Sequence, residues 1–225
     1  MKKHILLFIL LSLLSFIQIV WGQTSVTYSS SDTWICPDGV TTVTVECWGG
    51  GGPGGNGKGT SGGRTGIGGG GAGGAYAKST ISVTPGTSYT VTVGAQQTVA
   101  FAGNPSWFGS TSTVFAAGGA NGLSGIASSS SDNFGARGTG SLGSSIGTVL
   151  FKGGNGFQTT SNSSSPGGGG SAGNASDGNS ATDNNGAGSC NGRKCGWKWS
   201  GRKQSGRIRR RCARWRRRWC LGNNN

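Results

Sequence analysis

The chain has 225 residues and a formal net charge of +14, and 48 of its residues are glycine. Glycine is about three times as frequent as in an average protein, but it does not recur as a strict G-X-Y triplet, which excludes collagen. No stretch after residue 22 carries apolar residues at helical spacing without an intervening glycine. Long amphipathic helices are therefore excluded as well.

The N-terminal segment has the layout of a secretory signal peptide. Two lysines precede an apolar run over residues 5–20, which ends in Val20-Trp21-Gly22. This pattern predicts a signal peptide over residues 1–22 that is removed before Gln23. A membrane anchor is the alternative, but the run is shorter than the roughly 20 apolar residues that a spanning helix needs. We therefore expect a secreted protein, extracellular or at the cell surface.

The part of the chain after the signal peptide begins with short predicted β-strands, over residues 25–28, 33–36 and 42–48. In the last of these, Val43, Val45 and Cys47 alternate with polar residues and share one face. A Pro-Asp-Gly turn at 37–39 is expected to bring the two strands on either side of it together.

Further strands are predicted after the first glycine-rich stretch, over residues 75–83, 88–94, 113–117 and 148–152. A Pro-Gly pair between the first two of these predicts a turn and therefore a hairpin. The last two each lead into a pair of glycines. The pattern as a whole predicts an all-β fold, a small antiparallel sandwich or jelly-roll-like domain over residues 23–187.

Glycine-rich stretches, above all residues 49–74 and 167–170, separate the strands. One interpretation is that they are flexible linkers. The other is that they form extended helices of the polyproline II type, whose bare backbones approach and hydrogen-bond to one another as in polyglycine II. We favour the second interpretation, because strands bracket each stretch and hold its ends together.

The chain offers few groups for catalysis. Its single histidine, His4, lies in the predicted signal peptide, so the mature protein has no histidine base or metal ligand. Glu46 is the one acid on a clear strand, and a rigid pair of carboxylates is not expected. The stretch Gly52–Thr60 resembles a phosphate-binding loop, but glycine follows Lys58 where that motif needs serine or threonine. We predict no enzyme activity, no cofactor and no metal site.

Two groups of side chains are candidates for a structural or a binding role. Cys36 and Cys47 are the only cysteines before the tail and lie on neighbouring predicted strands of an exported chain, which predicts a disulfide. The alternative is two buried free thiols. The aromatic residues Trp34, Trp107 and Phe108 are candidates for a carbohydrate-facing surface, although a role as core anchors suits a domain with few large side chains better.

The N-terminal half resembles a known family. The matching stretches are residues 34–40, 43–52, 70–79 and 83–94, which resemble the glycine-rich domains of secreted and surface proteins of bacteria. Similar glycine-rich modules occur in adhesins and phage tail fibres. The resemblance implies a non-enzymatic structural or adhesion module at the cell surface, with surface glycans or other surface proteins as partners and no small-molecule substrate. It assigns no binding residue.

The tail, residues 188–225, has a different composition. Residues 190–225 hold 13 of the 20 lysines and arginines and no acid. One interpretation is a secreted cationic effector that binds nucleic acid or anionic membranes. Its contacts would come from Arg214, Trp215, Arg216, Arg217, Arg218 and Trp219.

The other interpretation of the tail is a reading-frame shift just before Cys190. Tryptophan has the single codon TGG, which read one base downstream always gives glycine, and the arginine codons AGG and CGG shift to glycine in the same way. We favour this hypothesis and expect the tail to be disordered. The nucleotide sequence decides between the two, because tail arginines encoded mostly by AGA, CGT or CGC would exclude the shift.

Overall fold

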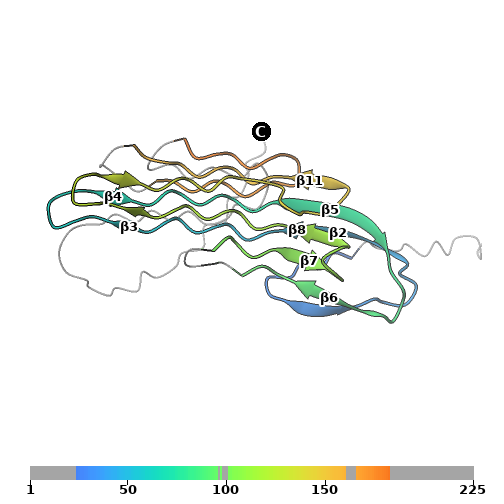
Figure 1. Cartoon of the computed structure of the whole chain (residues 1–225). Coiled ribbons are helices and arrows are strands. Elements are labelled where there is room, and N and C mark those ends of the chain that lie inside the picture. Colours follow the sequence, from blue (N-terminus) through green and yellow to red (C-terminus); the bar gives the residue numbers. More distant parts are fainter. Residues whose placement is uncertain (1–23, 96, 98–100, 161–165, 183–225) are drawn as a thin grey trace, which may run out of the picture.

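The structure is a computed structural model that describes residues 24–95, 97, 101–160 and 166–182. The predicted signal peptide and residues 214–219 of the tail lie outside this part of the chain. The described part contains eleven β-strands and no helix, which confirms the all-β class. Figure 1 shows an elongated molecule in which the longer strands gather at one end and extended segments run side by side toward the other.

The strands are β1 (Asp32–Ile35), β2 (Thr42–Trp48), β3 (Gly57–Lys58), β4 (Gly66–Ile67), β5 (Tyr76–Ser82), β6 (Ser88–Thr92), β7 (Ser106–Phe108), β8 (Val114–Ala116), β9 (Gly125–Ile126), β10 (Asn133–Phe134) and β11 (Val149–Phe151). They form a four-stranded sheet in the order β1-β6-β7-β8, a three-stranded sheet in the order β11-β5-β2, and the pairs β10-β4 and β3-β9. The two larger sheets are antiparallel and the two pairs are parallel. The strand predicted over residues 25–28 does not form.

Two predicted strand pairings are wrong. β1 pairs with β6 rather than β2, and β5 pairs with β2 and β11 rather than β6. The reason is that both turns carry the chain from one sheet to the other instead of back along the same sheet. The two turns are joined by backbone hydrogen bonds: the Cys36 N–H donates to the Thr87 carbonyl, and the Gly86 N–H donates to the Cys36 carbonyl. The sheets therefore face each other, as the predicted sandwich requires.

The core of the sandwich is small and consists of short side chains. Its centre is formed by Cys47, Ala77, Val114 and Ala116, with Val45, Ile81 and Leu150 packed against it. Val45 and Cys47 share the inner face of β2, which confirms the predicted alternation. On the opposite face of the sheet, the fully buried ring of Tyr76 lies between Trp48 and Phe151, its register partners on β2 and β11.

The glycine-rich stretches pack into a bundle around a central segment, residues 69–75. Every third residue of this segment repeats the same two backbone hydrogen bonds. Its N–H donates in the pairs Gly69–Leu123, Ala72–Ala120 and Ala75–Ala117. Its carbonyl accepts in the pairs Gly69–Gly55, Ala72–Gly52 and Ala75–Gly49. A repeat of three residues is that of a polyproline II helix, whereas a strand repeats every two.

The remaining residues of the central segment bond to further neighbours. The N–H groups of Gly70 and Gly73 donate to Phe157 and Gly154, and the carbonyls of Gly71 and Gly74 accept from Gly169 and Ala172. Residues 49–55, 117–123, 154–157 and 167–172 therefore surround the central segment, and Figure 1 shows such segments as wavy lines running side by side. Hydrogen bonds in several directions confirm the packed interpretation of the glycine-rich stretches over the flexible-linker interpretation.

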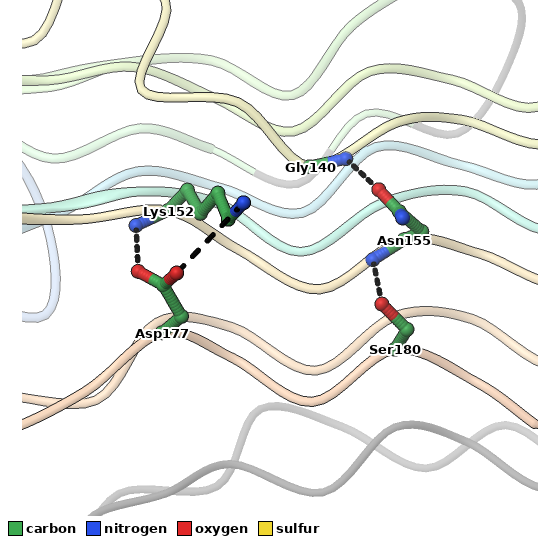
Figure 2. Close-up of polar contacts among 5 residues, drawn as sticks. All are labelled: Gly140, Lys152, Asn155, Asp177 and Ser180. Carbon is green, nitrogen blue, oxygen red and sulfur yellow. Dashed lines mark hydrogen bonds and ion pairs between the residues drawn. The ribbon is translucent and has the colours of Figure 1, made fainter.

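Polar side chains complete the bundle along its last described segment. Figure 2 shows Asp177 Oδ1 accepting from the Lys152 N–H at 2.9 Å, while Oδ2 lies 3.9 Å from Lys152 Nζ. The Asn155 side-chain oxygen accepts from the Gly140 N–H at 2.7 Å, and the Asn155 N–H donates to Ser180 Oγ at 3.0 Å. Side chains thus supply acceptors to backbone N–H groups alongside the carbonyls of the bundle.

Candidate ligand-binding surfaces

Two carboxylates of the described chain act as crosslinks in the scaffold. Glu46 pairs with Lys78 at 3.1 Å and so joins β2 to β5, and Asp177 pairs with Lys152 at 3.9 Å. Within the described ranges, no three His, Cys, Asp or Glu side chains gather into a group that could hold a metal ion. The same residues include no helix that is long and apolar enough to cross a membrane.

The stretch Gly52–Thr60, which resembles a phosphate-binding loop, begins within the bundle. The N–H groups of Gly52 and Gly55 donate to carbonyls of the central segment 69–75. A phosphate-binding loop needs such N–H groups to converge on the ligand. Because these two N–H groups are already bonded to carbonyls, they are not available to a phosphate, and Gly52 and Gly55 serve the packing of the bundle.

The predicted disulfide between Cys36 and Cys47 is absent, and both residues are buried free thiols. Cys36 follows β1, and its Sγ donates to the Val40 carbonyl at 3.3 Å. Cys47 lies on β2, with its Sγ 4.0 Å from the Val114 carbonyl oxygen in the core. The prediction is wrong because it assumed that β1 and β2 are neighbours, whereas they belong to different sheets.

We expect both thiols to resist alkylation in the native protein and to react once it is unfolded. Burial raises the pKa of Cys47 to about 11. Burial, followed by the charge of Asp38, also raises the pKa of Cys36. Little reactive thiolate therefore forms near pH 8. Iodoacetamide treatment without reductant, with and without guanidinium, followed by peptide mass spectrometry, measures this. A crosslinked Cys36–Cys47 peptide, or complete labelling of the native protein, would contradict it.

The three aromatic residues predicted to face a ligand do not form one surface. Phe108 is 7% exposed and lies 5.8 Å from Trp34 between ring centroids, so it is a core side chain. Trp107 precedes it on β7 and therefore points to the opposite face, where it stacks on Phe115 at 6.1 Å. Trp34 and Trp107 are both half-buried. The core-anchor interpretation therefore fits Phe108 better than a ligand-facing role.

A cleft that sequence reasoning missed lies at the sandwich, beside β6. It has a volume of about 440 Å³, and none of its lining residues is charged. Its polar lining consists of Ser82, Ser88, Tyr89, Thr90, Ser110 and Thr113. These residues come from β5, β6 and the turn between β7 and β8, so no spacing along the sequence marks the cleft. It is the first of two candidate binding surfaces.

The second candidate lies at the far end of the bundle, where Figure 1 shows β3 and β4. Leu123 and Ile126 are 56% and 59% exposed there, and their spacing of three residues matches the repeat of the bundle. The exposed Lys58 is the register partner of Ile126. The Thr65 N–H donates to Asp132 at 2.7 Å and so ties together the two loops of this end. We refer to Lys58, Leu123 and Ile126 as the tip surface.

The small sandwich and the bundle of glycine-rich segments together place the protein among all-β domains that are rich in glycine. A family model described as a glycine-rich domain matches residues 24–215, and the chain belongs to this family. The match includes every described residue and extends into the basic tail. Comparisons with curated proteins and with solved structures gave no match.

Proposed function

We propose that the protein is a secreted, non-enzymatic module that serves cell-surface structure or adhesion. The observation that carries this proposal is the bundle, in which every third residue of the central segment is held by backbone hydrogen bonds on two sides. The glycines let the segments of the bundle pack so closely that no side chain fits between them. The segments therefore cannot slide or bend independently. Such a bundle suits a stiff spacer that holds its end loops away from the sandwich.

The tip surface is the part of the spacer that we propose makes contact with a partner. Binding residues occur disproportionately on loops that a rigid scaffold positions. Leu123 and Ile126 expose apolar area, and the exposed Lys58 is the register partner of Ile126. Exposed apolar side chains with a polar rim are typical of contact with another macromolecule. A surface protein or a surface glycan is therefore the proposed partner.

A double variant, Leu123→Asp with Ile126→Asp, is expected to bind intact cells of the source organism at least about tenfold more weakly than the unmodified chain. Both side chains are exposed, so the substitutions place charge on the contact surface without entering the core. Flow cytometry with fluorescently labelled protein measures the binding.

Ile35→Asp is the matched control for the tip variant. Ile35 is 63% exposed on β1, in the sandwich at the opposite end of the molecule. It is expected to bind cells like the unmodified chain. If the control loses as much binding as the tip variant, or if the unmodified chain does not bind cells, adhesion through the tip surface is refuted.

A further inference from the structure

The outer edge of β2 is an open strand edge. The Gly49 N–H, directly after β2, donates to the Ala75 carbonyl, so the odd-numbered residues of this strand turn their backbone groups toward β5. Because these directions alternate along a strand, the backbone groups of Thr42, Thr44 and Glu46 point away from the sheet. Among the described residues, no hydrogen bond reaches the N–H or C=O groups of these three.

The other sheet edges each carry a cap. On β8, Phe115 exchanges two backbone hydrogen bonds with Ile146. On β1, the Thr33 N–H donates to the carboxylate of the preceding aspartate at 2.7 Å, and after β11 the Lys152 N–H donates to Asp177 at 2.9 Å. Proteins protect sheet edges in such ways because an open edge pairs readily with another strand. In the described part of the chain, β2 is therefore the edge that can accept one.

A strand added beside β2 would also cover part of the other sheet. β5 packs against β8, and β2 packs against β8 and β7, so the next position in this sheet lies over β7 and β6. Within the described ranges, no strand of the three-stranded sheet packs against β6 or β1. The inner side chains there, Trp34, Tyr89 and Val91, are only half-buried. The added strand should therefore turn apolar side chains inward at alternate positions.

The residues that precede β1 have this pattern. Val26 and Tyr28 alternate with serine and threonine over residues 24–30, which are as many as β2 contains. The strand that the sequence predicts here does not form, and no hydrogen bond joins residues 24–30 to the rest of the described chain. Val26 is 59% exposed. This segment is therefore free to pair with another molecule.

We propose that residues 24–30 of one copy add as a strand to the β2 edge of a second copy. Main-chain hydrogen bonds to the open edge supply affinity, and Val26 and Tyr28 face the half-buried rings of Trp34 and Tyr89. Residues 24–30 carry no charge, so the added strand does not oppose the Glu46 carboxylate beside it.

This contact joins two different surfaces, so each copy in the assembly can accept one strand and donate another. Such a head-to-tail contact yields a chain of copies unless it closes into a ring. The proposal extends the structural role given under the proposed function, but it concerns the sandwich and does not depend on the tip surface.

Sedimentation of the mature chain, residues 23–225, in reductant tests the proposal. We expect assemblies that lengthen as the protein concentration rises. Deletion of residues 23–30 removes the donor and is expected to leave monomers. Val26→Asn is expected to weaken association about tenfold, because an apolar anchor is lost. The matched control, Thr27→Asn, changes a side chain on the solvent face of the donated strand and is expected to associate like the unmodified chain.

Thr44→Pro tests the acceptor. Proline has no N–H and is tolerated on strand edges, so it removes a hydrogen bond to the donated strand without breaking one in the single copy. Ile35→Pro is the control, on the edge of β1, and is expected to assemble normally. Thr44→Pro and the donor deletion are each expected to be monomeric. Mixed together, they should form dimers, because one retains the donor and the other retains the open edge.

Several results would overturn the proposal: a mature chain that stays monomeric at every concentration, a donor deletion that still assembles, a mixture without dimers, or equal effects of a variant and its control. Circular dichroism checks that each variant is folded. If Thr44→Pro is not, a peptide of residues 23–30 replaces it as a competitor, and assemblies that the peptide does not shorten count against strand addition.

The tip variant separates this proposal from adhesion through the tip surface. It is expected to assemble like the unmodified chain. If it assembles but no longer binds cells, both proposals stand, and if it assembles and still binds cells, only the tip surface is refuted. Loss of assembly in the tip variant would place the contact between copies at the tip and would overturn strand addition.

Discussion

Gly71→Ala is expected to lower the free energy of unfolding by more than about 3 kcal/mol, at or beyond the upper end of the usual cost of overpacking. A Cβ on Gly71 would lie 2.1 Å from the carbonyl oxygen of Gly52 and 2.6 Å from that of Pro53. Both are backbone atoms of a segment that is itself hydrogen-bonded to the central segment. They cannot rotate away as the end of a side chain could, so whole segments would have to separate.

Gly51→Ala is the matched control, in a neighbouring segment of the same bundle. The nearest atom to a Cβ there is the Ala72 carbonyl oxygen at 3.6 Å, which is an ordinary contact. We expect stability to be unchanged or up to about 1 kcal/mol higher, because alanine reduces the conformational entropy of the unfolded chain. Urea unfolding followed by circular dichroism compares the two variants. Equal stability of both would show that close backbone packing does not hold the bundle together.

The three-residue repeat of the bundle is visible in the sequence once the structure shows where to look. Gly119, Gly122 and Gly125 are spaced by three, and a Cβ at any of them would lie within 2.3 Å of a backbone oxygen. The repeat lasts for only a few turns before the chain reverses and a new segment begins. A search for a continuous collagen-like triplet therefore correctly excludes collagen and still misses these short helices.

The sequence predicted strands better than it predicted their partners. The alternation in β2 is clear because one face of that strand meets the core and the other does not. The turn at residues 37–39, in contrast, is compatible with a hairpin and with a crossing between sheets. Only the packing of the two sheets selects the crossing, and the disulfide prediction failed with the hairpin on which it depended.

The candidate surfaces were harder to predict than the fold. Phe108 was recognised as a notable aromatic, but its burial depends on Trp34 and Tyr89, which belong to other strands. The residues that line the cleft come from β5, β6 and the turn after β7, so only the strand order brings them together. The exposure of Leu123 and Ile126 likewise follows from the position of their segment in the bundle.

The junction between the sandwich and the bundle depends on three aromatic rings. Trp48, Tyr76 and Phe151 each stand at the end of a strand, where the chain passes into or out of the glycine-rich segments. The bundle gains most of its order from hydrogen bonds, each of which contributes only about 0.5 to 1.5 kcal/mol net. Ordered glycine also carries a high entropic cost. Packing of the buried Tyr76 ring between the half-buried Trp48 and Phe151 rings is therefore a large part of what fixes the segments to the sandwich.

Tyr76→Ala is accordingly expected to lower the free energy of unfolding by about 3 to 5 kcal/mol, the usual cost of removing a buried aromatic ring. Tyr76 is 0% exposed, with its ring centroid 5.0 Å from that of Trp48 and 6.0 Å from that of Phe151. Phe101→Ala is the control, since Phe101 is 71% exposed and should cost about 0.5 kcal/mol or less. Urea unfolding followed by tryptophan fluorescence measures both. If Tyr76→Ala lowers the free energy of unfolding no more than Phe101→Ala does, the hydrogen bonds of the bundle hold the junction and the aromatic rings are not needed to anchor it.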